Sequence, residues 1–366
     1  MPTLVQLLRA GKRELCLDGN IADAIVKAIE ESTALEKLSC RHATFENAFP
    51  SCASLRVLVL ESSRIEDACF ESICNLSALE MLSIRKCHVK DVTSLARLQN
   101  LRELNVAGIR ARGLEGAVAA MPALETLDIS YINFNPSQVI TAARNLTRLV
   151  LNGVHIDERT ASVVGNVSQV DLSAGWITPS AARVLFASLR RTTMLQLRGT
   201  ILDSFPSAAL ARNKTLQYLD VYPNGVSDSS FLATNKGLRT LVVGRFCTLD
   251  ATLQALKALE RNSTMLDFNM GYTPLPDSSA LRALLKVNHT LLIFTFLHPR
   301  DADKALCESV LRHPHVVVKS MSVDIHMGDT YVRRDMYGRM FAALAHPKWR
   351  RDGDHAIAHR VFRYLT

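Results

Sequence analysis

Leu55-Arg56-Val57-Leu58-Val59-Leu60 is the stretch that decides the fold, because its pattern keeps returning along the chain. The order is Leu, two variable residues, Leu, one variable residue and a third aliphatic residue, and it recurs in hexapeptides that begin at Leu79, Leu101, Leu124 and Leu146. A period of 20 to 27 residues is typical of stacked supersecondary units. A chain of 366 residues with this pattern is therefore expected to grow by adding similar layers.

We take the central residue of each copy as its anchor. Side chains alternate along a strand, so the anchor and the residue two positions later are expected to point inward, and their neighbours outward. The anchors are Leu15, Leu38, Leu58, Leu82, Leu104, Leu127, Leu149, Val170, Leu195, Leu219, Leu241, Phe268 and Phe294, with Met321 as a candidate fourteenth.

The segments between strands have helical spacing. Thr178 followed by Pro179 predicts a helix start, with an N-cap hydroxyl and Pro at the first helical position. One face of this helix, over residues 179–189, is expected to carry Ala182, Leu185, Phe186 and Leu189. Short parallel strands are therefore expected on one face of the stack, with helices or tight turns on the other.

Several later strands follow a shared lead-in: Asn213-Lys-Thr-Leu216, Asn262-Ser-Thr-Met265 and Asn288-His-Thr-Leu291. With these residues the chain resembles leucine-rich repeat proteins, and its later part resembles the ribonuclease-inhibitor and tropomodulin type. The resemblance implies an α/β leucine-rich repeat solenoid, a horseshoe of about 13 repeats. In such a fold the parallel strands form the concave face, and helices and turns form the convex face.

The turn after each strand departs from the usual repeat. The Asn that hydrogen-bonds the turn backbone in this family is present only at Asn20 and Asn224, three residues after the last inward residue. Other polar side chains take its place at Ser63, Cys87, Thr200 and Thr273. We expect an N-terminal capping helix over residues 1–14, the solenoid over 15–323 and a basic C-terminal extension or cap over 324–366.

Composition limits the function only weakly. Hydrophobic residues make up 48% and aromatic residues 6%, which suits thin layers of Leu, Val, Ile and Ala. The net charge of +8 permits an acidic protein or a nucleic acid as partner without requiring either. No apolar run is long enough to span a membrane, so no membrane insertion is expected.

The cysteines and the first residues bear on the compartment. Several of the eight cysteines replace an apolar repeat residue, as buried thiols do in a reducing compartment. A cytoplasmic or nuclear protein is expected. The acid-free residues 1–13 keep a mitochondrial presequence open as the alternative to a capping helix. Inside a cell, the six Asn-x-Ser/Thr sequons would serve the repeat geometry; they start at Asn75, Asn145, Asn166, Asn213, Asn262 and Asn288.

The outward residues of the strands are the candidate contact surface for a protein partner. Tyr and Arg are the residue types that most often anchor interfaces, and they gather on two consecutive strands. The predicted patch consists of Met194, Gln196, Arg198, Tyr218, Asp220 and Tyr222. Asp128 and Asp171 add acidic charge to the same face, and the alternative is an ordinary solvated sheet face.

The C-terminal segment is the second candidate contact region. Residues 324–366 carry eight basic and five acidic residues. They are expected either to cap the last repeat or to dock on a protein or on RNA phosphates. The docking residues would be Arg333, Arg334, Lys348, Arg350, Arg351, Arg360 and Arg363.

The sequence carries no complete motif for catalysis or metal binding. His355 and His359 lie four residues apart, but Ala356 stands where the metalloprotease motif needs Glu. Cys16 begins a Cys-x-Asp sequence on the first strand with no catalytic domain around it. His42, His88 and His155 each follow a strand and are interpreted as turn residues. We therefore expect no enzyme activity, cofactor, metal or small-molecule substrate.

Three functions remain open from the sequence. The first is a non-catalytic protein–protein interaction scaffold, a subunit of a larger intracellular assembly. The second is a substrate-recruiting adaptor of a ubiquitin ligase or a pathogen effector. The third is an RNA-contacting component of a ribonucleoprotein complex.

Overall fold

The computed structural model describes residues 3–110, 112–274, 278–297 and 317–321. The chain divides into two compact units, Met1–Ser322 and Val323–Thr366, and all described residues belong to the first. The seven basic residues predicted to dock through the C-terminal segment lie outside the described residues. No helix in the described part is long and apolar enough to cross a membrane.

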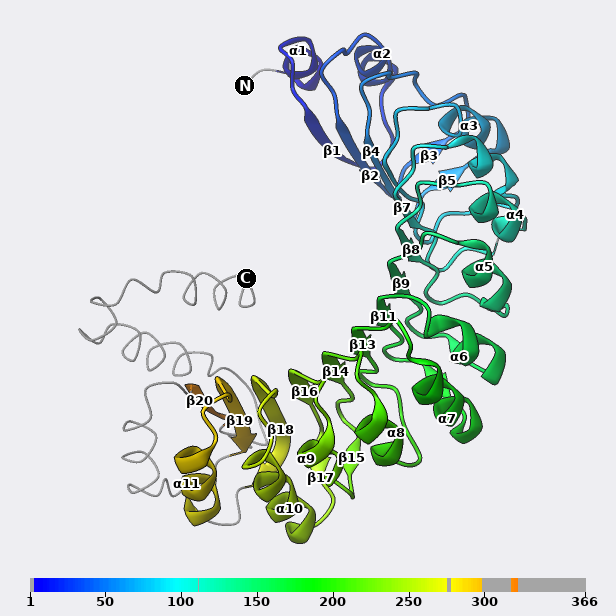
Figure 1. The fold of residues 1–366 in the computed structure, drawn as a ribbon. Helices are drawn as coiled ribbons and strands as arrows, with labels where there is room; N and C mark the ends of the chain where they lie inside the picture. The colour runs from blue at the N-terminus through cyan, green and yellow to red at the C-terminus, as the bar shows by residue number, and fades with distance from the viewer. Residues whose placement is uncertain (1–2, 111, 275–277, 298–316, 322–366) are drawn as a thin grey trace, which may run out of the picture. The chain divides into compact units, whose positions relative to one another are not determined.

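A single parallel sheet organises the first unit. Its 14 strands are hydrogen-bonded in chain order and line the inner side of the stack (Figure 1). They are β1 (Glu14–Asp18), β2 (Lys37–Arg41), β4 (Val57–Glu61), β6 (Met81–Ser83), β7 (Glu103–Asn105), β8 (Thr126–Asp128), β9 (Arg148–Val150), β11 (Gln169–Asp171), β13 (Met194–Gln196), β14 (Tyr218–Asp220), β16 (Thr240–Val242), β18 (Asp267–Pro274), β19 (Ile293–Leu297) and β20 (Val317–Met321).

The strand register confirms the thirteen anchors. Each anchor is paired with the next along the sheet, from Leu15 opposite Leu38 to Phe268 opposite Phe294. The fourteenth strand exists, but its expected anchor was wrong: Val318 pairs with Phe294, whereas Met321 pairs with Leu297. The anchor of this strand thus lies three residues before the expected one. The strand is rich in valine, because β-branched residues suit a strand as well as Leu does.

Helices cover the outer side (Figure 1). They are α1 (Leu4–Arg9), α2 (Asp23–Glu30), α3 (Asp67–Ile73), α4 (Leu114–Ala119), α5 (Ser137–Ala142), α6 (Glu158–Val164), α7 (Pro179–Ser188), α8 (Ser207–Arg212), α9 (Phe231–Thr234), α10 (Leu249–Leu259), α11 (Ser278–Val287) and the 3₁₀-helix η1 (Thr93–Arg97). The start of α7 is as predicted, because the Thr178 hydroxyl accepts a hydrogen bond from the Ala181 amide at 3.2 Å.

The anchors and helices enclose one continuous apolar core. Leu38, Leu127 and Phe268 are fully buried, as are the other anchors to within 2%. Helix α7 contributes Leu185 and Phe186 as predicted, and Leu189 directly after it is also buried. Ala182 packs against the core half-buried, and Ala181, which was not predicted, is fully buried beside it. Burying each such side chain stabilises the fold by roughly 1.5–3 kcal/mol. Adding repeats therefore adds stability without thickening the core.

The turn after each of the first nine strands shares one conformation. The fourth residue after the anchor has a positive φ and donates its amide to a carbonyl of the next repeat, as from Gly153 to Ser173 at 3.0 Å. This left-handed conformation is strain-free only for glycine, and four of the nine positions are glycine. They are Gly19, His42, Ser62, Lys86, Gly108, Tyr131, Gly153, Ala174 and Gly199. Pro223 ends the series, since its ring cannot adopt positive φ.

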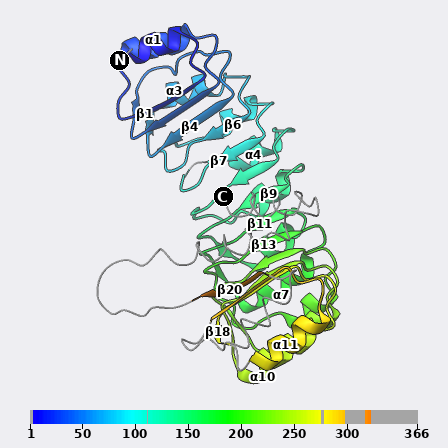
Figure 2. The same ribbon diagram turned by 90° about the vertical axis from the view of Figure 1, so that its left-hand side faces the viewer.

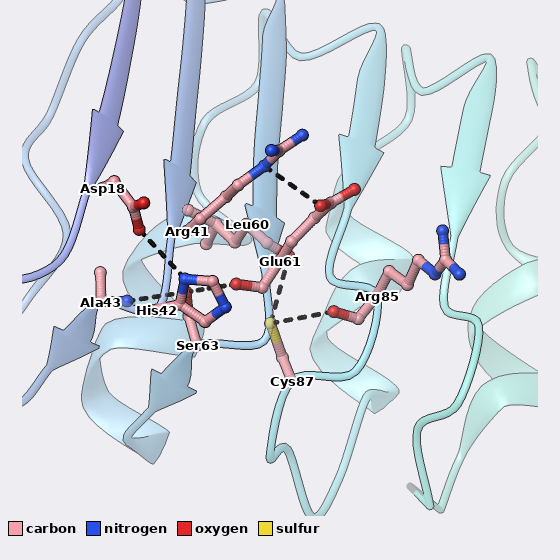
Figure 3. A network of polar contacts seen from close by, with 9 residues as sticks. All are labelled: Asp18, Arg41, His42, Ala43, Leu60, Glu61, Ser63, Arg85 and Cys87. Atoms are coloured by element: carbon pink, nitrogen blue, oxygen red, sulfur yellow. Dashed lines mark hydrogen bonds and ion pairs between the residues drawn. The ribbon is translucent and has the colours of Figure 1, made fainter. Parts of the chain in front are cut away.

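The predicted substitutes for the turn asparagine bond the backbone. The Cys87 thiol donates to the carbonyl of Leu60 at 3.2 Å, and Ser63 accepts the amide of Ala43 (Figure 3). Thr200 and Thr273 serve in the same way, as acceptors of the amides of Gly175 and Phe246. The turn therefore needs a compact polar atom at this position more than it needs an amide.

Three short two-stranded sheets follow some of these turns. They pair β3 (Thr44–Phe45) with β5 (Arg64–Ile65), β10 (His155–Ile156) with β12 (Trp176–Ile177), and β15 (Gly225–Val226) with β17 (Arg245–Phe246). Each strand except β15 exposes its first side chain and buries its second, as with exposed Trp176 before buried Ile177. These sheets form the edge of the stack at which the main strands end.

Four asparagines in the later repeats form a second ladder. Each accepts backbone amides ahead of its own strand, and its amide group donates to carbonyls of the preceding repeat. They are Asn213, Asn235, Asn262 and Asn288. Three of these asparagines begin sequons, and their side chains carry the repeat geometry as the sequence predicted.

Candidate binding surface

The concave sheet face carries the predicted contact patch on adjacent strands. The β13–β14 patch consists of Met194, Gln196, Arg198, Tyr218, Asp220 and Tyr222. Met194 lies opposite Tyr218, and Gln196 lies opposite Asp220. Figure 2 shows the sheet from the inner side, with β9, β11 and β13 one below another. Strand alternation turns the first and last residues of both strands to this face, because Leu195 and Leu219 between them are buried. Arg198 and Tyr222 follow the ends of the two strands, each directly after a buried aliphatic residue.

Arg198 and Tyr222 form the most distinctive contact of the patch. The guanidinium carbon lies 5.3 Å from the centre of the tyrosine ring, within cation–π distance. No carboxylate of the described residues lies within ion-pair distance of Arg198. By contrast, the first strands pair their charges with one another, as in Arg41–Glu61 at 3.3 Å (Figure 3). The patch therefore leaves an oriented cation on an aromatic surface.

Asp220 lies at the base of the patch and is only 6% exposed. Its Oδ1 accepts the amide of Tyr222 at 3.0 Å. Burial raises the pKa of this carboxyl, although the Tyr222 amide and nearby Arg198 partly oppose the shift. Burial also raises the pKa of the Tyr218 hydroxyl, and the carboxylate of Asp220 adds to this shift. Tyr218 therefore stays neutral and can donate a hydrogen bond to a partner.

Asp128 and Asp171 hold the turns at the ends of their own strands. Asp128 Oδ1 accepts the Ser130 amide at 3.0 Å and the Ser130 hydroxyl at 2.6 Å, and its Oδ2 accepts the side-chain amide of Asn105 at 3.0 Å. Asp171 accepts the Ser173 amide at 3.0 Å. These carboxylates are half-buried and already bonded, so less of their hydrogen-bonding capacity is available to a partner than the sequence suggested.

The same turn bond explains a signal that sequence reasoning missed. An Asp or Asn directly after the anchor accepts the amide two residues later in five strands, including Asn105 at 3.0 Å and Asn269 at 2.8 Å. Asp and Asn are thus interchangeable at the position after the anchor, where the turn needs an acceptor for a backbone amide. This position therefore has a structural role. An Asx residue at a fixed place in the repeat could have revealed this role.

The structure brings only part of the predicted surface together. Asp171 lies opposite Gln196, next to the patch. Asp128 is two strands further away on β8, roughly 10 Å beyond Asp171 at the usual strand spacing of about 4.8 Å. The acidic residues therefore do not form one continuous site. In the described part of the chain, no three His, Cys, Asp or Glu side chains are grouped to hold a metal ion.

The chain shares its fold with solved bacterial leucine-rich repeat structures. One is an internalin, InlF, of Listeria monocytogenes, with a TM-score of 0.51 and 16% identity over 88% of this chain and 89% of that one. Another is a leucine-rich repeat protein of Leptospira interrogans, with a TM-score of 0.53 and 15% identity over 87% of this chain and 98% of that one. The chain therefore has the leucine-rich repeat fold predicted from its sequence.

Sequence comparison does not identify a family. No protein-family model matches the chain, and a search of curated proteins finds no significant similarity. The structural likeness thus bears on the fold alone, a fold typical of protein–protein interaction scaffolds.

Proposed function

We propose that the protein is a non-catalytic scaffold that binds a protein partner through the β13–β14 patch. The contact between Arg198 and the ring of Tyr222 carries this proposal. Arg and Tyr dominate the energetics of interfaces, and the cation–π contact orients both side chains before a partner arrives. Half-buried Tyr218 beside them adds a neutral hydroxyl.

The proposed partner presents a largely apolar surface to this patch, with a charge that is neutral or weakly acidic. An acidic group would meet Arg198, which is exposed and lacks a carboxylate in ion-pair distance among the described residues. An aromatic or aliphatic side chain would lie against Tyr222 and Met194. The described cysteines are all free thiols, five of them buried, which favours a reducing compartment.

Quantitative affinity purification of the tagged full-length chain, after crosslinking in its native cells, tests the proposal. The double variant Arg198→Ala/Tyr222→Ala is expected to reduce recovery of the specific partners by about tenfold or more. The matched control is Arg148→Ala/Thr126→Ala, which removes residues from β9 and β8 on the same face. Circular dichroism confirms that both variants fold.

The outcome separates the candidate functions. Unchanged recovery with the patch variant would refute this surface. A ligase component among the lost partners would favour the adaptor function over an assembly subunit. Recovery that depends on RNase treatment would favour the RNA-contacting function.

A further inference from the structure

A groove follows the edge at which β2, β4, β6 and β7 end. It encloses about 880 Å³ and is lined by four basic side chains, Arg64, Lys86, Lys90 and Arg110, against two carboxylates, Glu66 and Asp67. His42 and His88 also line it. We call it the rim groove. The rim groove shares no residue with the β13–β14 patch, which lies on later strands.

Part of this charge is already neutralised and part is not. Arg64 Nε donates a hydrogen bond to Glu66 at 2.8 Å. His42 Nδ1 lies 3.0 Å from Asp18, as Figure 3 shows. Lys86, Lys90 and Arg110 are exposed, and no carboxylate in the described ranges comes within ion-pair distance of them. Three cations that line the groove are therefore available to bind an anion.

The same edge becomes apolar further along the chain. Arg64, His88, Arg110, Asn133, His155, Trp176 and Ile201 occupy the same place, six residues after successive anchors. Trp176 is paired with His155 on one side and with Ile201 on the other. Trp176 is 67% exposed and Ile201 68% exposed, and the His155 ring lies 5.0 Å from the indole ring. We call His155, Trp176 and Ile201 the apolar rim. So large an exposed indole marks a contact site.

The groove and the apolar rim are within reach of one extended peptide. Trp176 lies five repeats after Arg64, a separation of roughly 24 Å at the usual strand spacing of about 4.8 Å. An extended chain rises about 3.3 Å per residue, so about seven residues span the distance. A single linear segment can therefore place charges in the groove and an apolar side chain on the indole.

The charges on this edge favour a peptide over other occupants. Single-stranded nucleic acid also uses cations and aromatic rings, but it carries a phosphate at every base and needs cations throughout. Next to the apolar rim the edge instead carries Asp157, whose carboxylate accepts bonds from Asn135 and Thr160.

We propose that this edge binds an extended acidic segment of a partner protein. The segment's carboxylates lie over Lys86, Lys90 and Arg110, and an apolar side chain near one of its ends packs on Trp176 between His155 and Ile201. This gives the protein a second contact surface, separate from the β13–β14 patch.

Fluorescence anisotropy with the full-length chain tests the proposal. The probes are fluorescein-labelled ten-residue peptides with four glutamates at one end and a phenylalanine at the other, in both orientations. Lys86→Glu/Lys90→Glu/Arg110→Glu and, separately, Trp176→Ala are each expected to weaken binding by about tenfold or more. Arg183→Glu/Lys236→Glu/Lys257→Glu, which changes three exposed cations elsewhere, is the matched control for charge.

The controls make each outcome decisive. A peptide with lysines in place of the glutamates should not bind, and Arg198→Ala/Tyr222→Ala should bind the acidic probe like the wild type. The proposal is overturned if neither orientation binds, or if the triple variant and its control lose the same affinity. It is also overturned if a twelve-nucleotide single-stranded RNA binds more tightly than the peptides and loses affinity with the same variants.

Discussion

Asn262→Ala should destabilise the protein more than almost any other polar substitution in the solenoid. The side chain is 3% exposed and lies between two repeats. Its Nδ2 donates to the carbonyls of Leu232 at 2.6 Å and Asn235 at 3.3 Å. Its Oδ1 accepts the amides of Thr264 and Met265, each at 2.8 Å. Alanine removes these four bonds, together with the one that Oδ1 accepts from the Thr264 hydroxyl at 3.2 Å, and leaves buried backbone groups without partners.

The expected loss in the free energy of unfolding follows from the four bonds to backbone groups. A buried hydrogen bond contributes about 1 kcal/mol net. The loss in the free energy of unfolding is therefore about 3–4 kcal/mol, with the longer bond to Asn235 contributing least. Asn262→Asp should cost at least as much, because a carboxylate would face the carbonyl oxygens of Leu232 and Asn235. Asn145→Ala is the matched control: this exposed residue makes one bond, to the Pro122 carbonyl at 2.8 Å, worth about 0.5–1 kcal/mol.

Urea unfolding followed by circular dichroism measures these differences. An unchanged dependence of the unfolding free energy on urea would show that the same surface is exposed in each variant. Hydrogen exchange adds a local readout, since the amides of Thr264 and Met265 should lose protection in Asn262→Ala. The reasoning fails if Asn262→Ala and Asn145→Ala differ by less than about 1 kcal/mol, or if those two amides stay protected.

Three further predictions concern other positions. Gly165→Ala should destabilise the fold by about 1–3 kcal/mol, because the added methyl group would overlap the Ser188 carbonyl; Gly116→Ala, in open space on α4, should instead stabilise it by about 0.5–1 kcal/mol, and thermal unfolding distinguishes the signs. The pKa of Asp220 is raised in the folded state, so the folded protein binds this proton more tightly than the unfolded chain does. The free energy of unfolding therefore falls as pH rises through the pKa of the folded state. Asp220→Asn keeps the acceptor for the Tyr222 amide, so its gain in unfolding free energy over the wild type should be greater at pH 7 than at acid pH; equal gains at both would contradict this. Thiol labelling with peptide mapping should modify the exposed cysteines of the described residues in the native state, namely Cys16 and Cys247. Burial raises the pKa of four other thiols, which should react only after unfolding; the values are about 12 for Cys40, Cys69 and Cys74 and about 11 for Cys87.

The repeat could be predicted from the sequence because each layer obeys local rules. The Leu spacing defines the inward residues, and sheet register follows because a shift by one residue would turn every anchor outward. The turn substitutes Ser63 and Cys87 were also predictable, since one polar atom is needed at a fixed place in each repeat. The fourteenth anchor was misplaced because Val317 and Val318 have no Leu to mark them.

The sequence alone thus determined the strand order, the anchors and the neighbouring positions of the β13–β14 patch, all of which follow from a short period. Only the tertiary structure decided what the polar side chains do, because their bonds cross from one repeat to the next. It assigned Asp128 and Asp171 to their turns and placed Arg198 over Tyr222. It also aligned Arg64 and Trp176 on one edge: residues 112 apart in sequence share a surface because the repeats stack in register.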